Sequence, residues 1–528
     1  MMRGNFFCMA IAIKLHLAVL RHTDHHSSAL KSDNRECGVA KSQWSFKSAI
    51  EISAALKARK VSAVELTEDA IGRIERHDGK INAICVRDFS RALDAARAAD
   101  AALGRGEHRP LLGIPLTVKE SFNIAGLPTT WGFPEQKNFM PQQDALSVTR
   151  MKEAGGVILG KTNVPIGLGD WQSYNDIYGT TNNPYDLART PGGSSGGSSA
   201  ALAAGYGPLS IGTDIGGSLR VPAFHCGVFA HKPTFGLVAS RGHTPPPLPP
   251  LPFDRDLSVL GPMARSAADL SLLLDVIAGP DPIEAGKAYR LELPPPRHTA
   301  LKDFRVLLIE TDPLLPTDKD VRAGIERLAD HLGKAGVPVT RKSPLWPDFA
   351  ASSRLYMRML LSFLGATFQP DIYAGAQAAA AQLASDDMSL RAERLRGIAL
   401  SYRERVMAEG GRTRLRAQWR ELFNSFDAVI CPIMPTPAYV QDHAPEQETR
   451  RINIDGKEYS YPDQLAWPGV ATLPGLPATA IPTGFSPAGW PIGVQIVGPF
   501  LEDRTPLKLA ELIEREFCGF VPPPMFDD

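Results

Sequence analysis

The sequence lacks the marks of a membrane protein and of a general nucleic-acid binder. No uninterrupted apolar run reaches the roughly 18 residues that a membrane-spanning helix needs, and the best candidate, residues 6–20, is interrupted by Lys14 and His16. The 57 Lys and Arg residues balance 57 Asp and Glu residues, so the formal net charge is zero. A general nucleic-acid binder would carry a basic excess, although charge balance does not exclude a local basic patch. We therefore expect neither a membrane span nor nucleic-acid binding.

Cysteine is scarce and scattered. The six cysteines form no C-x-x-C pair, so they indicate neither a zinc site nor a disulfide framework. Free thiols in a reducing cytosol are the simplest interpretation, which predicts a cytoplasmic protein. The hydrophobic content of 44 % and the charged content of 22 % are typical of a soluble globular chain with a large core.

The first 43 residues differ from the rest of the chain. Arg3 and the apolar stretch after it resemble the start of a signal peptide, but no small-x-small cleavage site follows. We expect residues 1–43 to be a poorly ordered extension, which an upstream start codon could produce, with a targeting signal as the alternative. Regular patterning begins near Trp44, and we expect one domain over residues 44–528.

Strand and helix patterns alternate after that point. Residues 62–77 have apolar positions at helical spacing, and Ser62 could cap that helix. Residues 111–118 and 157–161 are short apolar runs typical of buried strands. Residues 350–425 are mostly helical in pattern and no internal repeat is visible. This alternation predicts an α/β layered fold.

Three short polar segments carry most of the information about function. They are Thr-Val-Lys-Glu at 117–120, Gly-Gly-Ser-Ser-Gly-Gly at 192–197 and Gly-Thr-Asp-Ile-Gly-Gly-Ser at 212–218. Together they supply a lysine, several serines and backbone amides next to glycine, which are the parts needed for serine-based acyl transfer without a histidine. Each also has an ordinary alternative: a solvated lysine at a strand end, a flexible linker and a structural turn.

The lysine and the third segment suit this chemistry for physical reasons. Lys119 directly follows an apolar run, where desolvation would lower its pKa and make the neutral amine available as a base. Thr213 and Asp214, followed by residues 216–218, predict a sharp turn that aims consecutive N–H groups at a developing oxyanion. Asp214 and Arg220 are spaced to support this turn by an ion pair.

Rival sites are less well supported. A nucleophile elbow around Ser194 would need an apolar strand just before it, and residues 184–191 form none. A phosphate loop would need Gly-Lys-Ser/Thr after the glycines, which is absent. His225 and His231 are the histidines nearest to Ser218 in sequence, but His225 has an apolar context and no partnered carboxylate is evident. We therefore favour a mechanism that does not depend on histidine.

The motifs resemble those of a known family. Residues 191–197 (Pro-Gly-Gly-Ser-Ser-Gly-Gly) and 212–223 (Gly-Thr-Asp-Ile-Gly-Gly-Ser-Leu-Arg-Val-Pro-Ala) are similar to the motifs of the amidase signature family. Lys119 precedes Ser194 by 75 positions, and Ser194 precedes Ser218 by 24, as the family's lysine, bridging serine and nucleophile are spaced. The resemblance extends from about Trp44 to the end of the chain.

The resemblance implies a role for each matching residue. Ser218 would be the nucleophile, Ser194 would relay its proton, and neutral Lys119 would be the base that later helps to protonate the leaving amine. The peptide bond between Gly193 and Ser194 would be cis. The implied oxyanion hole consists of the N–H groups of Ile215, Gly216, Gly217 and Ser218. The implied supporting residues are Ser195, Thr213, Asp214 and Arg220.

The resemblance also implies the architecture. We expect an α/β/α body with a large mixed central β-sheet covered by helices on both faces, no metal or other cofactor, and possible homodimerisation. The loop at residues 245–252 is unusually rich in proline and could reshape the entrance to the site.

The motifs specify the bond that is cleaved and not the acyl group. Six residues are candidate pocket residues, with core packing as the alternative for each: Trp131, Phe133, Trp171, Tyr174, Met434 and Trp467. They predict a small-molecule amide substrate with an apolar or aryl acyl group. The alternative function is that of the catalytic subunit of a tRNA-dependent amidotransferase, which shares these motifs and works with partner proteins.

Overall fold

The structure, a computed structural model, describes residues 42–250, 252 and 255–526. The predicted N-terminal extension, residues 1–43, therefore lies almost wholly outside the described residues. The strands are β1 (Ile84–Arg87), β2 (Pro115–Lys119), β3 (Val157–Thr162), β4 (Tyr174–Asn175), β5 (Gly179–Thr180), β6 (Leu209–Asp214), β7 (Phe229–Lys232), β8 (Val259–Ala264), β9 (Val306–Leu308), β10 (Val339–Thr340), β11 (Ala428–Cys431), β12 (Arg451–Ile454), β13 (Lys457–Ser460), β14 (Ala478–Phe485) and β15 (Pro491–Val497). The helices are α1 (Ala49–Lys57), α2 (Ala63–Ile81), α3 (Phe89–Gly104), α4 (Leu146–Glu153), α5 (Gly196–Ala203), α6 (Arg220–His225), α7 (Ala267–Ile277), α8 (Lys319–Lys334), α9 (Phe349–Gly365), α10 (Pro370–Ala381), α11 (Leu390–Ile398), α12 (Tyr402–Ser425), α13 (Ala466–Thr472) and α14 (Arg504–Glu516).

One large sheet organises the molecule. Its 11 strands run in the order β1-β3-β2-β6-β8-β7-β14-β15-β11-β9-β10. The pairs β2–β3, β2–β6, β9–β10 and β9–β11 are parallel, and the other pairs are antiparallel. The sheet is therefore mixed, and the predicted layered α/β fold is confirmed.

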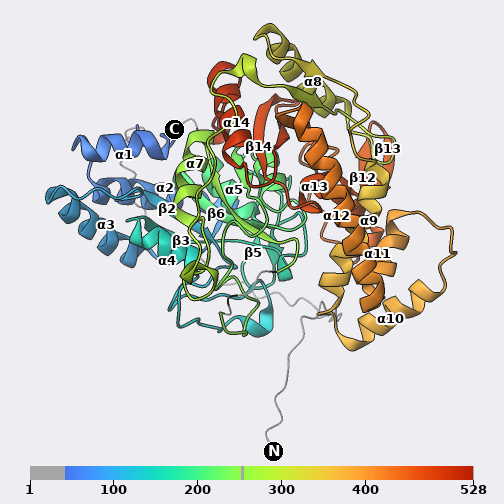
Figure 1. Cartoon of the computed structure of the whole chain (residues 1–528). Helices are drawn as coiled ribbons and strands as arrows, with labels where there is room; N and C mark the ends of the chain where they lie inside the picture. Colours follow the sequence, from blue (N-terminus) through green and yellow to red (C-terminus); the bar gives the residue numbers. More distant parts are fainter. Residues whose placement is uncertain (1–41, 251, 253–254, 527–528) are drawn as a thin grey trace, which may run out of the picture.

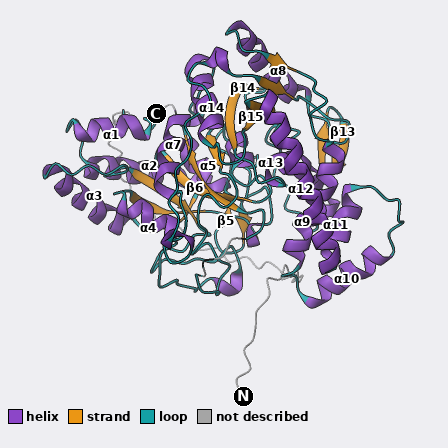
Figure 2. Cartoon of the chain, viewed as in Figure 1, coloured by secondary structure: helices purple, strands orange, loops and turns teal. Residues whose placement is uncertain are grey.

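Helices cover the strands along the sheet (Figures 1 and 2). Helix α3 packs on β3, α5 on β2 and β6, α7 on β8, and α6 and α8 on β14 and β15. Figure 1 shows α9, α11 and α12 grouped on the side of the molecule opposite α1 to α4. In the described part of the chain, no helix combines the length and the apolar character needed to cross a membrane.

Local sequence signals account for several of these elements. Ser62 caps α2: its side chain accepts from the Glu65 N–H, and the Glu65 side chain accepts in return from the Ser62 N–H, a capping box that satisfies two otherwise unpaired donors. Every residue of β2 and of β6 is buried, and polar side chains of the two strands bond to each other: Thr117 Oγ1 donates to Ser210 Oγ over 2.9 Å.

The parallel pairing of β2 with β6 positions the polar segments. Thr117 lies opposite Ser210 and Val118 opposite Ile211, so both strands reach their carboxyl ends at the same edge of the sheet. Lys119 is the last residue of β2, and Asp214 is the last residue of β6. Two of the three polar segments therefore meet at this edge because of strand register alone.

Candidate active site

Lys119 lies at the centre of a cluster of hydroxyl groups. Its Nζ atom is 2.8 Å from Ser194 Oγ, 2.9 Å from Ser195 Oγ and 2.8 Å from Thr213 Oγ1. The side chain is completely buried. The lysine is therefore not a solvated strand end, and it joins all three polar segments in one place.

This environment favours the neutral amine. Burial holds the pKa of Lys119 well below its usual range, although the Asp214 carboxylate acts in the opposite direction. A neutral amine has two N–H donors and one lone pair. With three hydroxyl oxygens within hydrogen-bond distance, two can accept from Nζ while the third donates its proton to the lone pair. The cluster thus suits a lysine that takes up a proton from a serine.

The Gly/Ser run is a packed element and not a linker. The Gly193–Ser194 peptide bond is cis, as the resemblance implied. A side chain at Gly193 would overlap the backbone around Asp170, so only glycine fits there. The Ser195 N–H donates to the Ser218 carbonyl over 3.2 Å, and helix α5 begins at the next residue. Backbone contacts therefore attach the run to the turn that carries Ser218.

The turn after β6 presents backbone amides. Among described residues, the N–H groups of Ile215, Gly216 and Ser218 have no hydrogen-bond partner. The Gly217 N–H, in contrast, donates to Asp214 Oδ1 over 2.9 Å. The expectation that Gly217 contributes to an oxyanion hole was therefore wrong for this conformation, because its donor is already used within the turn. Three N–H groups remain free for a ligand.

The hydroxyl group of Ser218 makes no hydrogen bond to another described residue. The side chain is buried, with 6 % of its surface exposed. The implied link between Ser194 and Ser218 is thus not formed here, although catalytic hydrogen bonds often close only when substrate binds. Ser218 nevertheless lies on the same turn as the three free amides.

Two aromatic side chains hold the peptide planes of this turn. Tyr356 Oη donates to the Ile215 carbonyl over 2.6 Å, and Trp171 Nε1 donates to the Gly216 carbonyl over 2.8 Å. In a trans peptide the N–H points away from the carbonyl of the preceding residue. Tyr356 therefore directs the Gly216 N–H, and Trp171 directs the Gly217 N–H towards Asp214. Tyr356 was not predicted as a site residue, because its position on α9 gives no local signal of this contact.

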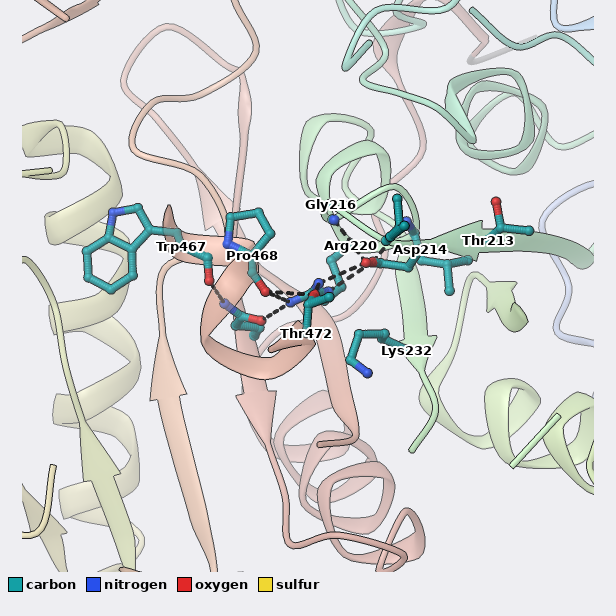
Figure 3. A network of polar contacts seen from close by, with 12 residues as sticks. Thr213, Asp214, Gly216, Arg220, Lys232, Trp467, Pro468 and Thr472 are labelled. Atoms are coloured by element: carbon teal, nitrogen blue, oxygen red, sulfur yellow. Dashed lines mark hydrogen bonds and ion pairs between the residues drawn. The ribbon is translucent and has the colours of Figure 1, made fainter. Parts of the chain in front are cut away.

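A buried ion pair supports the turn from behind (Figure 3). Arg220 binds Asp214 through two hydrogen bonds of 2.9 and 3.0 Å, so the structure contains the pair that the spacing predicted. Burial raises the Asp214 pKa, but the charge and hydrogen bonds of Arg220 outweigh it and hold the pKa below its usual value. The carboxylate thus stays ionised and accepts from the backbone of the turn.

The same arginine connects the turn to the C-terminal part of the chain (Figure 3). It donates to the Pro468 carbonyl over 3.0 Å, to Gln495 Oε1 over 2.6 Å and to Thr472 Oγ1 over 2.9 Å. Gln495 in turn donates to the Trp467 carbonyl over 3.0 Å. The position of the turn therefore depends on α13 and β15.

Neither of the histidines weighed from the sequence contacts the cluster. His231 Nε2 is 3.1 Å from Asp503 Oδ1, and its Nδ1 is 2.9 Å from Thr479 Oγ1. Burial lowers the pKa of His225 to about 3. A third histidine, His243, lies near Lys119: its Nε2 is 3.1 Å from Ser121 Oγ and its ring stacks on Trp131 at 4.9 Å. No local pattern around His243 indicated this contact.

The six candidate pocket residues divide into groups. Trp171 contacts the turn directly, and Trp131 and Phe133 follow the strand that ends at Lys119. Tyr174 is half-buried and belongs to a polar network, accepting from Arg450 over 2.9 Å. Met434 and Trp467 have no exposed surface, and Trp131 and Phe133 have 1 % and 3 %, so the role of these side chains in a pocket stays a prediction.

No metal site accompanies this arrangement in the part of the chain that the structure describes: no three His, Cys, Asp or Glu residues there are grouped to hold an ion. The chemistry that the cluster supports is transfer of a proton from a serine to a lysine beside a set of free backbone amides.

The comparisons with known proteins agree with this geometry. A family model described as Amidase matches residues 65–507, so the chain belongs to the amidase signature family of hydrolases acting on C–N bonds. A glutamyl-tRNA(Gln) amidotransferase subunit of Geobacter sp. (strain M21) is 31 % identical over 503 residues, which cover 88 % of this chain and 96 % of that protein. The corresponding subunit of Anaeromyxobacter dehalogenans (strain 2CP-C) is 32 % identical over 506 residues, covering 90 % and 97 %.

Solved structures support the fold. A structure of an inhibitor-bound complex, described in connection with the origins of an s-triazine catabolic enzyme, has a TM-score of 0.75 at 28 % identity and covers 90 % of this chain and all of its own. A bacterial aryl acylamidase of the amidase signature family has a TM-score of 0.74 at 23 % identity, covering 90 % of this chain and 97 % of its own. The latter likeness concerns the fold alone.

Proposed function

We propose that the chain hydrolyses carboxylic amides through Ser218, Ser194 and Lys119. The observation that carries this proposal is the buried Lys119 amine, with a lowered pKa and Ser194 Oγ at 2.8 Å. A neutral buried lysine next to a serine is a base positioned to activate a serine nucleophile.

The residues act in two half-reactions. Ser218 Oγ attacks the amide carbon while its proton passes to Ser194, and the proton of Ser194 passes to Lys119 Nζ. The C–O bond forms as the carbonyl π bond opens to an oxyanion, which the N–H groups of Ile215, Gly216 and Ser218 stabilise. Collapse of this intermediate breaks the C–N bond, and the amine leaves with the proton returned through Ser194.

Water completes the cycle. A water molecule attacks the acyl-enzyme while its proton moves along the same path to Lys119. The ester bond to Ser218 then breaks, the serine recovers its proton, and the carboxylic acid is released as a carboxylate. The net reaction converts an amide and water into a carboxylate and an amine or ammonia.

We propose an apolar or aryl acyl group for the substrate. Trp171 contacts the oxyanion turn, Trp131 contacts the Ser121 carbonyl, and Phe133 follows two residues later; aromatic side chains commonly line small-molecule sites. Turnover of benzamide-type and long-chain amides well above that of acetamide and propionamide would support this preference, and the opposite order would contradict it.

The base is tested by Lys119→Ala. We expect this variant to lose amide hydrolysis while its circular dichroism and cooperative unfolding stay close to those of the wild type. His231→Asn is the matched control, since His231 is buried but bonded to Asp503 and Thr479. A Lys119→Ala enzyme with near-normal kcat, together with an inactive His231→Asn enzyme, would refute the assignment.

A second candidate function is that of an amidotransferase component that works with partner proteins. The identity to the glutamyl-tRNA(Gln) amidotransferase proteins, 31–32 % over most of both chains, favours it. Strict preference for glutamine or asparagine, together with partner proteins that co-purify from the native host, would support this function. Turnover of glutamine alone would not distinguish the two functions. Turnover of aryl amides without partners would favour the independent amidase.

We also propose that the enzyme is cytoplasmic and forms a homodimer. Cell fractionation and sedimentation equilibrium of the purified chain would test these two points independently of the reaction.

A further inference from the structure

Arg255 carries a charge that no described residue neutralises. The side chain is partly buried and makes no hydrogen bond or ion pair within the part of the chain that the structure describes. Its contacts are aromatic: the guanidinium carbon is 5.2 Å from the centre of the Trp131 ring and 5.5 Å from that of Phe363. Arginine in such a position normally has a carboxylate partner, because burying an uncompensated charge is costly.

Two carboxylates flank Arg255 in the sequence: Asp254 lies outside the described residues, and Asp256 does not fill this role. Asp256 is held by two arginines of α12: Arg412 at 2.8 Å and Arg405 even closer. Burial lowers the pKa of Arg255 to about 10, and no acidic group among the described residues raises it. Arg255 therefore remains a cation at neutral pH, and no described residue accepts a hydrogen bond from it.

Other buried arginines in the described part of the chain have hydrogen-bond partners, although the partner is not always a carboxylate: Arg265 donates to the carbonyls of Leu202, Gly207 and Lys47. Arg450 binds Asp170 at 2.5 Å, and Arg394 binds Glu448 at 2.9 Å and Asp463 at 2.7 Å. Arg220 is paired with Asp214, as described above. The absence of a described partner at Arg255 is thus a local feature of this position and not a general property of the fold.

Arg255 lies beside the candidate active site. The Trp131 ring that it covers stacks on His243, and Trp131 Nε1 donates to the Ser121 carbonyl, two residues after Lys119. After burial, the charge of Arg255 is the next largest cause that lowers the pKa of His243, ahead of Lys119, so Arg255 lies close to the same imidazole as the lysine. The guanidinium therefore lies near the segment that carries Lys119 and Ser121, on the side of the Trp131 ring.

We propose that Arg255 binds an anionic group of the substrate, so that the preferred amides carry a carboxylate on an apolar or aryl skeleton. The planar guanidinium can donate two parallel hydrogen bonds to a carboxylate, and Trp131 and Phe363 supply apolar surface for the carbon skeleton. This inference rests on the proposed amidase function and specifies its substrate class. A purely structural Arg255, stacked on two rings, is the competing explanation.

Two pairs of amides test the proposal, one for each side of the scissile bond. On the acyl side, succinyl p-nitroanilide is compared with 4-methylpentanoyl p-nitroanilide, in which an isopropyl group replaces the carboxylate. On the amine side, the 4-methylpentanoyl amide of 4-aminobenzoate is compared with that of 4-isopropylaniline. The ratio of kcat/KM within each pair isolates the contribution of the charge.

The variants are Arg255→Met, Arg255→Lys and, as a matched control, Arg76→Met, which removes an exposed arginine of α2. We expect the wild type to prefer the anionic member of at least one pair, and Arg255→Met to reduce that preference by roughly 10- to 100-fold, the value of a hydrogen-bonded charge. Arg255→Lys should lose part of the preference for the anionic amide, and Arg76→Met should keep all of it. If Arg255→Met changed kcat/KM equally for the anionic and the neutral amide of each pair, the proposal would be overturned.

A binding measurement separates this inference from the proposed function. If the wild type hydrolyses none of the four amides, the amidase proposal fails. Calorimetric binding of succinyl p-nitroanilide and of the amide of 4-aminobenzoate to Ser218→Ala, with and without Arg255→Met, then decides the role of Arg255. If Arg255→Met weakens the binding of at least one of these two anionic amides, the anion site is supported. If neither amide binds, or if both bind equally well with and without Arg255→Met, the anion site is refuted.

Discussion

Replacing Tyr356 with phenylalanine would remove one oxygen atom behind the oxyanion turn. The hydroxyl donates to the Ile215 carbonyl over 2.6 Å, and the side chain is completely buried. The Ile215 carbonyl and the Gly216 N–H belong to one rigid peptide unit and point in opposite directions. Loss of the hydroxyl therefore loosens a donor that the reaction needs without touching the donor itself.

The size of the effect follows from the contact. The variant loses one buried hydrogen bond and leaves a carbonyl without its donor, which costs about 1–3 kcal/mol of stability. Complete loss of an oxyanion donor lowers kcat by about 10²–10³-fold. Because the Gly216 N–H is retained and only less well aligned, we expect a smaller decrease in kcat, of about 10-fold, with little change in KM.

The assay compares Tyr356→Phe with Tyr206→Phe. Tyr206 is equally buried, but its hydroxyl has no hydrogen-bond partner among the described residues, so its removal should leave kcat unchanged and unfolding nearly unchanged. Steady-state hydrolysis of a p-nitroanilide gives kcat and KM, and urea unfolding gives stability. If both variants keep the wild-type kcat and differ only in stability, Tyr356 supports the fold and does not position the oxyanion donor.

Two further predictions concern buried charges. Burial lowers the pKa of Lys119 below the 10.5 of a free lysine, so between the folded and the unfolded pKa the unfolded chain binds more protons than the folded chain. The stability of the wild type should therefore rise relative to Lys119→Met as pH increases from 7 to 9.5. Urea unfolding of both proteins across this range tests the prediction, and a constant difference in stability would contradict the lowered pKa. The same titration requires kcat/KM to fall when pH decreases through the lowered pKa of Lys119. Arg220→Met leaves the buried Asp214 carboxylate without its partner, and we expect a loss of about 3–5 kcal/mol in unfolding free energy together with loss of activity. A loss below about 1 kcal/mol would mean that the pair does not support the turn.

The sequence predicted the parts of the site that depend on local pattern. Lys119 and Asp214 each end a buried strand, and parallel register brings those strand ends together. The family and the layered α/β fold were also predictable, since the motifs around Ser194 and Ser218 are specific. The capping of α2 by Ser62 could be predicted from a serine and a glutamate at the right spacing.

Contacts between distant segments could not be predicted in this way. Tyr356 reaches the turn from 141 positions away, and nothing around it distinguishes it from a core tyrosine. Trp467 has the same aromatic character as Trp171, yet the packing of α13 encloses it completely. The engagement of the Gly217 N–H by Asp214 is local, but an Asp followed by glycines is compatible with several turn geometries.

The dependence of Arg220 on the end of the chain has a consequence for biosynthesis. Ribosomes synthesise Arg220 long before two of its partners, because Pro468 follows 248 positions later and Gln495 follows 275 positions later. The turn that carries Ser218 can therefore gain its full support only when nearly the whole chain has been translated. A nascent or prematurely terminated chain would hold the nucleophile without the framework that positions it, so catalytic competence arises late and in one step with completion of the sheet.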